Sequence, residues 1–258
     1  MIKMLRADFN RLMRSTAFRI AIFSMIGLAS LLMFVQATAM DYTVPLSRVI
    51  FLPMSMFGVA MGAFVSVFVG TDFSDGFIRN KLLATDRRSN LVISQIIVSC
   101  ISCVICYALV TVFTTIVGSF FFERDVVVID FIKNFLIGIF MSISTGCLFA
   151  VVTVIIGKKT PSIVWCMGLA FVMLFAAMRT NSVLVQKEYK DGVLNPNYVT
   201  GARRLVYEIL HDLNPCGQAS QLSSWDVWNP VRIIIINFVA IAVLSALGCV
   251  LFRKKNIN

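Results

Sequence analysis

The chain has 258 residues, of which 59% are hydrophobic and 14% charged, and its formal net charge is +10. Charged residues make up about a quarter of a typical soluble domain, so this composition excludes a soluble domain of the same length. The basic residues gather at the ends of apolar runs, where they suit anionic headgroups and topology control. We therefore expect an integral membrane protein and no nucleic-acid partner.

Before the first apolar run, residues 1–16 have the pattern of an amphipathic helix. Four apolar residues recur at helical spacing: Ile2, Leu5, Phe9 and Leu12. Lys3, Arg6 and Arg14 lie away from that face. The pattern predicts an interfacial helix on the membrane surface. The alternative is a simple basic extension of the first span.

Six apolar runs approach or exceed the roughly 20 residues that a helix needs to cross a bilayer. The predicted spans are Ile20–Ala39, Val49–Gly70, Leu91–Gly118, Phe135–Ile156, Ser162–Met178 and Val231–Phe252. The fold class expected is thus an all-α integral membrane protein with six transmembrane helices, in one domain covering 1–258. The first run is longer than the apolar region of a signal peptide, so we expect an uncleaved span.

Lysine and arginine are distributed unevenly among the segments that connect the spans, and this asymmetry predicts the orientation of the chain in the membrane. The N-terminal segment, the segment 71–90, the Lys158–Lys159 turn and the C-terminal tail are rich in basic residues. The two short connections on the other side carry only Arg48, Arg124 and Lys133. Both termini and the segment 71–90 are therefore predicted to be cytoplasmic. The long segment 179–230 then lies outside, although its basic residues follow the rule poorly.

The segment 179–230 is expected to contain a short helix folded back on the membrane. Thr200 can cap this helix, and Asn214-Pro215 ends it after Leu213. Three leucine or isoleucine residues share one of its faces: Leu205, Ile209 and Leu213. Trp225 and Trp228 precede the last span, where indoles favour the membrane interface.

Catalytic and metal motifs are not supported by their context. The Cys100–Cys106 stretch CISCVIC lies within an apolar run, so we expect its small residues to pack a helix interface and not to hold an iron–sulfur cluster. The GKKT turn lacks the rest of a P-loop. Glu208 and His211 form one E-x-x-H pair, expected on a solvated helix face. We therefore predict no enzyme activity, no metal and no cofactor in this chain, and a free Cys216.

The six predicted spans contain no aspartate or glutamate in their cores. Ion-coupled transporters usually keep ionisable residues inside the membrane. If the chain moves a substrate uphill, the energy is therefore expected from another chain, and an uncharged interior would favour hydrophobic or amphipathic cargo.

The segment 71–90 is longer and more charged than a turn between two spans requires. A helix over Asp72–Thr85 would place its apolar residues on a wide arc of its surface. One part of this arc could pack against the protein's own spans, and another part could bind a partner. The apolar residues are Phe73, Phe77, Ile78, Leu82 and Ala84. Asp75 and Arg79 would lie at i, i+4 spacing and could pair. The alternative is a loop whose charges only set topology.

The stretch Gly70–Val98 resembles the segment between the second and third spans of ABC-2 type transporter permeases. The matching positions are Gly76, Ile78, Arg79, Asn80, Lys81 and Arg88. Asn214-Pro215-Cys216-Gly217-Gln218 is similar to the proline-containing stretch before the last span of that family, and the six-span arrangement agrees. The resemblance covers essentially the whole chain, and its single motifs are degenerate.

The resemblance implies a bacterial plasma-membrane permease of an ABC exporter, with a cytoplasmic coupling helix that contacts a separate ATPase subunit. The implied contact residues are Phe73, Asp75, Phe77, Ile78, Arg79, Asn80, Leu82, Arg88, Lys158 and Lys159. Two ATPase subunits, which hold ATP and magnesium, and a second copy or a related permease would complete the complex. The expected cargo is an antimicrobial or toxic peptide, with a drug or lipid next. The alternative is a non-transporting sensor or assembly protein that binds a partner through 179–230.

Overall fold

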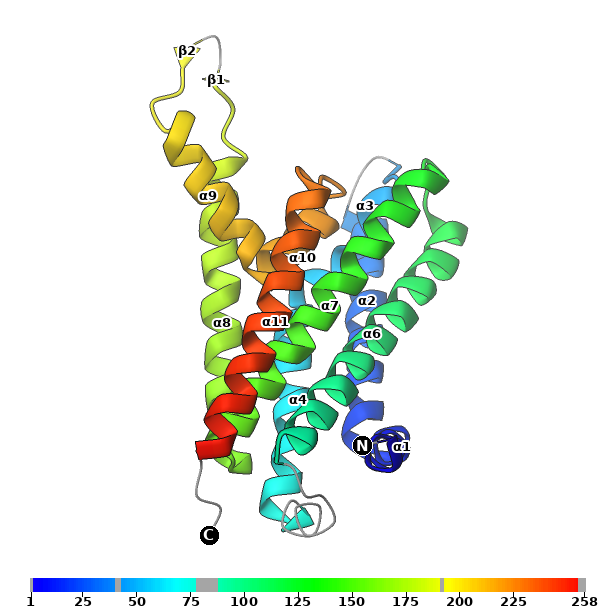
Figure 1. Cartoon of the computed structure of the whole chain (residues 1–258). Coiled ribbons are helices and arrows are strands. Elements are labelled where there is room, and N and C mark those ends of the chain that lie inside the picture. The colour runs from blue at the N-terminus through cyan, green and yellow to red at the C-terminus, as the bar shows by residue number, and fades with distance from the viewer. Residues whose placement is uncertain (1, 40–42, 78–87, 191–192, 255–258) are drawn as a thin grey trace.

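The computed structural model describes residues 2–39, 43–77, 88–190 and 193–254 (Figure 1). In chain order the helices are α1 (Ile2–Arg14), α2 (Thr16–Ala39), α3 (Ser47–Ile50), the 3-10 helix η1 (Leu52–Met56), α4 (Phe57–Ser74), α6 (Arg88–Phe121), α7 (Val128–Ile156), α8 (Lys159–Leu184), α9 (Gly201–Leu213), α10 (Pro215–Ser223) and α11 (Pro230–Lys254). A short antiparallel ladder joins β1 (Tyr189–Lys190) to β2 (Val193–Leu194). The described chain is thus almost entirely helical.

Among the described residues, six helical stretches are long and apolar enough to cross a membrane. They are Thr16–Ala39, Ser47–Ser74, Ser89–Phe121, Val128–Ile156, Lys159–Leu184 and Pro230–Phe252. Each contains one predicted span, so the prediction of six apolar helices of spanning length is confirmed. Helix α1 and the end of α11 lie at the lower end of the bundle in Figure 1, whereas α9 and the ladder lie at the upper end.

The second predicted span is not one continuous α-helix. It begins as α3, passes through η1 and continues as α4. Pro53 lies in η1, and a proline supplies no backbone N–H to a helical hydrogen bond. Met54 donates its N–H to Phe51 O at 2.9 Å, as a tighter turn requires. The predicted span Val49–Gly70 is therefore present, but its first turns are not regular α-helix.

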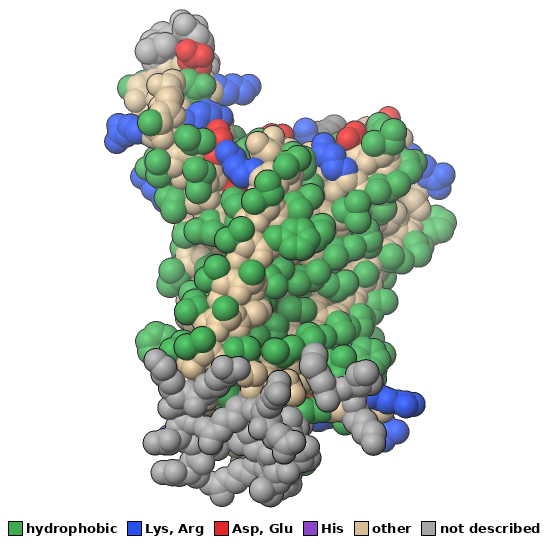
Figure 2. Space-filling view, in the orientation of Figure 1, with side chains coloured by type: hydrophobic (Ala, Val, Ile, Leu, Met, Phe, Trp, Pro, Cys, Tyr) green, Lys and Arg blue, Asp and Glu red, His purple; other side chains and the backbone are tan. Residues whose placement is uncertain are grey.

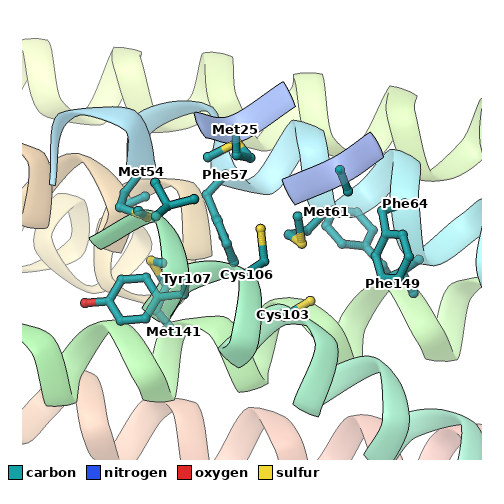
Figure 3. Packing of buried hydrophobic residues seen from close by; sticks show 14 of the residues in the cluster. Met25, Met54, Phe57, Met61, Phe64, Cys103, Cys106, Tyr107, Met141 and Phe149 are labelled. Carbon is teal, nitrogen blue, oxygen red and sulfur yellow. The ribbon is translucent and has the colours of Figure 1, made fainter. Parts of the chain in front are cut away.

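The core lies between α4, α6 and α7. More than half of the apolar window of each of these spans is buried, compared with 28% in α2 and less in α8 and α11. Figure 3 shows side chains of α2, α4, α6 and α7 meeting there, among them Met25, Phe57, Tyr107 and Phe149. The peripheral helices therefore expose most of their apolar side chains, as lipid-facing helices do.

Small residues allow α6 and α7 to approach closely. A Cβ built on Gly146 of α7 would lie 2.9 Å from Cys100 Cα of α6, and one on Gly138 would collide with the Tyr107 ring. Cys103 and Cys106 are fully buried. The predicted role of the CISCVIC stretch in helix packing is confirmed, and all seven cysteines are free thiols.

Gly217 in α10 gives a sharp test of packing at the upper end. A Cβ there would collide with the backbone carbonyl oxygen of His211, whereas a Cβ on Gly168 of α8 meets nothing within 4 Å. We expect Gly217→Ala to lower the free energy of unfolding by about 2 kcal/mol, because the α9–α10 turn must shift. Gly168→Ala is the matched control, expected to be neutral or slightly stabilising. Thermal unfolding in detergent compares them, and equal melting temperatures would contradict the close approach.

Candidate functional site

The segment predicted to contact a partner begins at the lower end of α4. Asp72, Phe73 and Ser74 belong to α4, and the Asp75 N–H donates to Thr71 O at 2.9 Å. Gly76 then adopts a φ of +72°, in the left-handed region that favours glycine. The prediction of one helix over Asp72–Thr85 is therefore wrong in its first part, because α4 ends before the turn at Gly76.

On both sides of this turn, the predicted contact residues differ in exposure. Phe73 packs edge-on against Phe252 of α11 with ring centroids 6.3 Å apart, so it contacts the chain's own last helix. Asp75 is exposed and Phe77 is half-exposed. Ile78, Arg79, Asn80 and Leu82 lie outside the described residues. Arg88 begins α6, and its side chain also lies outside the described part.

The second predicted contact, the turn between α7 and α8, lies beside the end of α4. Gly157 ends α7 in the left-handed region, and α8 begins at Lys159. A Cβ on Gly70 of α4 would lie 3.0 Å from Lys159 Cα, so the two backbones nearly touch. Lys158 is exposed and Lys159 is half-buried. The structure thus brings the start of 71–90 and the Lys158–Lys159 turn together at one end.

Asp72, the last buried residue of α4, forms a polar cluster with α1 and α6. Its side chain is fully buried, pairs with the Arg11 guanidinium and accepts a hydrogen bond from Gln95 Nε2 at 2.6 Å. The Arg11 guanidinium also lies 4.3 Å from the Phe68 ring centroid. Burial lowers the pKa of Arg11, while Asp8 and Asp75 act in the opposite direction. The helix leading into 71–90 is therefore tied to α1 by a partly buried ion pair.

A second contact of α1 lies beside the first. Asp8 is buried and accepts a hydrogen bond from the Ser94 hydroxyl of α6 at 2.8 Å. Leu12, on the same face of α1, is also buried. The face that packs on the bundle is therefore not purely apolar. The spacing of Asp8, three residues after Leu5 and four before Leu12, already placed its carboxylate on the apolar face in the sequence.

At the upper end, Arg232 of α11 joins two acidic residues of α9. Its Nε donates to Asp212 Oδ2 at 2.5 Å, and its terminal nitrogens reach Glu208 Oε2 at 3.2 and 3.3 Å. Asp212 is fully buried and also accepts from Gln221 Nε2 at 2.7 Å. Buried carboxylates at both ends, Asp72 and Asp212, correct the expectation of an interior without charge. Neither residue lies in a predicted span: Asp72 closely follows the second span, whereas Asp212 belongs to α9, and the bundle buries both.

His211 lies inside this upper cluster and not on a solvated face. It is fully buried, with Nδ1 2.6 Å from Thr180 Oγ1 and Nε2 3.0 Å from Ser220 Oγ. Burial lowers its pKa, and the opposing effect of Asp212 is smaller. A neutral imidazole has one donor and one acceptor, which suits two hydroxyl partners. The expected solvated E-x-x-H pair is therefore wrong, because α9 turns His211 towards α8 and α10.

The helix predicted after Thr200 is present as α9, which ends at Leu213 as expected. Leu205, Ile209 and Leu213 each expose 42% or more of their surface, so this chain does not cover their shared face. Trp225 packs against Phe51, with centroids 5.5 Å apart, and Trp228 against His211. Both indoles thus contact the protein directly.

The surface cavities of the described residues include an apolar groove and a polar cleft. An apolar groove of about 570 Å³ runs between α6, α7 and α11, lined mainly by isoleucines such as Ile97 and Ile241. A polar cleft of about 700 Å³ lies at the upper end between α8 and α9. Within the described ranges, no group of three or more histidine, cysteine or acidic side chains is placed to hold a metal ion.

No family model matches the chain, and no curated protein matches it either.

Proposed function

We propose that the chain is the permease subunit of an ATP-driven exporter of the ABC-2 type, with the lower end of the bundle facing the cytoplasm. In this proposal α1 lies along the cytoplasmic membrane surface, and 71–90 is the coupling segment that contacts an ATPase subunit. The resemblance of Gly70–Val98 to that family motivates the proposal. Six helices of spanning length are compatible with it.

The observation that carries the proposal is the adjacency of two predicted contact regions. The start of 71–90 and the Lys158–Lys159 turn meet where Gly70 approaches Lys159. A partner bound at the lower end could therefore touch both. Asp75 and Phe77 are exposed there, which leaves them free to contact it.

The polar cluster around Asp72 suggests how a movement could enter the membrane domain. Arg11 and Gln95 join the end of α4 to α1 and α6. A force on 71–90 would then act on three helices together instead of bending one loop. ATP and magnesium belong to the partner ATPase in this proposal, and a second permease copy or a related chain encloses the path. Amphipathic peptides are the first cargo to test.

Co-purification from native membranes tests the proposal. We expect the wild-type chain to recover an ATPase, identified by the P-loop in its peptide sequence. Asp75→Ala/Phe77→Ala should lower that recovery about tenfold, because exposed aromatic residues often dominate an interface. ATPase activity of the complex in lipid should fall with it.

Met13→Ala/Arg14→Ala is the matched control, since it also removes one exposed apolar and one exposed charged side chain at the lower end. It should leave recovery unchanged. Failure of the wild type to recover any P-loop ATPase would contradict the exporter proposal. Equal losses in both double variants would contradict the assignment of 71–90.

A membrane sensor or assembly protein is the second candidate. The polar cleft at the upper end, between α8 and α9, favours it, because a non-transporting protein would use such an exposed cavity for binding. Loss of partner binding on deletion of β1 and β2, with no ATPase recovered, would support this candidate over the exporter.

A further inference from the structure

The cleft at the upper end lies between the end of α8, the chain before α9 and the first two turns of α9. Its volume is about 700 Å³, and polar side chains form most of its lining. The residues that matter for its chemistry are Arg179, Ser182, Gln186, Tyr198, Arg203 and Tyr207. With Asn197 and Thr200, which also line it, two guanidinium groups, two hydroxyls, two amides and two phenols surround one space.

The cleft is positively charged, and no acidic side chain in its lining neutralises that charge. None of the lining residues is acidic. Neighbouring arginines are neutralised: Arg204 pairs with Glu208, and Arg232 with Asp212 and Glu208. For Arg179 and Arg203 the structure shows no ion pair within the described residues. The two cations are therefore available to an anion from outside the chain.

The start of α9 adds to the positive potential. Thr200 occupies the N-cap position, but its side chain makes no capping hydrogen bond. The first N–H groups of an uncapped helix carry a partial positive charge. Thr200 and Arg203 both line the cleft, so the helix end and the arginine act on the same space.

Apolar surface adjoins this basic cleft on two sides. Below Arg179, α8 exposes Phe171, Val172, Phe175 and Met178. Beyond Arg203, α9 exposes Leu205, Val206, Ile209, Leu210 and Leu213. Figure 2 shows hydrophobic side chains covering the middle of the visible face, with basic and acidic side chains gathered above it around α9. The cleft is therefore at the level where the apolar surface gives way to charge.

We propose that the cleft binds the phosphate headgroup of an anionic phospholipid in the leaflet at the upper end. Arg179 and Arg203 would hold the phosphate, and the acyl chains would lie against the exposed apolar faces of α8 and α9. A soluble anion would use the arginines but not the apolar faces, which is why a lipid is assigned. This site does not depend on a transport function.

Titration of the full-length chain in detergent tests the site, with short-chain phosphatidylglycerol, short-chain phosphatidylcholine and glycerol phosphate as probes. The wild type should bind phosphatidylglycerol more tightly than the other two. Arg179→Gln/Arg203→Gln should raise the Kd for phosphatidylglycerol about tenfold, since each basic residue contributes to binding an anionic lipid. Arg179→Lys/Arg203→Lys keeps the charge and should retain the preference.

Arg48→Gln/Arg124→Gln is the matched control, because it removes two exposed charges at another part of the upper end, in α3 and in the α6–α7 connection beside it. It should leave the Kd for phosphatidylglycerol unchanged. Equal weakening in both glutamine variants would overturn the site in favour of general charge attraction. Glycerol phosphate binding as tightly as the lipid would overturn the lipid assignment, and so would equal affinity for the two phospholipids.

Discussion

Replacing Arg11 with alanine is expected to lower the free energy of unfolding by about 3 kcal/mol. Asp72 is fully buried, and the variant would leave its carboxylate with Gln95 but without a cation. Removing one partner of a buried ion pair typically costs about 3–5 kcal/mol. The lower end of that range applies, because the Arg11 side chain is 30% exposed. Thermal and denaturant unfolding of the full-length chain in detergent measures the loss.

Removing the charge of Asp72 instead of that of Arg11 should lower the free energy of unfolding by less. In Asp72→Asn the remaining charge belongs to Arg11, whose side chain is 30% exposed and can shift towards water more easily than a fully buried carboxylate can. We expect a loss of about 1–2 kcal/mol, with the amide still accepting from Gln95. Arg14→Ala, an exposed residue of the same helix, is the control and should change stability by less than about 0.5 kcal/mol. Equal losses for Arg11→Ala and Arg14→Ala would show that the pair does not stabilise the fold.

The six spans could be predicted because their causes are local. A helix that crosses a bilayer needs a long apolar run, and a run such as Val231–Phe252 meets this requirement whichever helices pack against it. The C-terminal end of α9 could be predicted in the same way. In Asn214-Pro215 the proline disfavours the helical conformation of the residue before it, so the helix ends there. Such signals need no knowledge of which helix packs on which.

Asp72, Asp212 and His211 could not be placed in the same way. Each looks like a solvent-exposed residue in its own segment, and each is fully buried in the structure. Their burial depends on partners far along the chain, for example Arg11 for Asp72. Polar pairs between distant helices leave no periodic trace, so hydropathy assigned these residues to the surface. The break at Pro53 was visible in the sequence, but hydropathy alone does not weigh backbone hydrogen bonds.

Two of the buried carboxylates, Asp72 and Asp212, occupy similar positions at opposite ends of the bundle. Asp72 joins the end of α4 to α1 and α6, whereas Asp212 joins α9 to α11 and, through Gln221, to α10. Each therefore fastens a short helix to helices of spanning length. This connection at both ends is compatible with the proposed permease, and at the upper end it holds α9, which forms one wall of the proposed lipid cleft.

Replacing Arg232 with alanine is expected to lower the free energy of unfolding by about 3–4 kcal/mol. The variant leaves the buried Asp212 without its cation, and Gln221 alone cannot neutralise a carboxylate. Arg232→Lys should be intermediate, because an ammonium group keeps the charge but cannot contact Asp212 and Glu208 with a planar fork. Unfolding in detergent gives the loss, and hydrogen exchange should show α9 opening first.

Arg204 provides the matched control for this prediction. It pairs with the same Glu208 at 3.3 Å, but within one helix and near the surface. Such i, i+4 pairs contribute about 0.3–0.5 kcal/mol, so Arg204→Ala should be nearly neutral. A loss in Arg204→Ala as large as in Arg232→Ala would mean that Glu208, and not the buried Asp212, controls the stability of the upper end. A large loss confined to Arg232→Ala would instead identify the Arg232–Asp212 pair as the contact that holds α9 on α11.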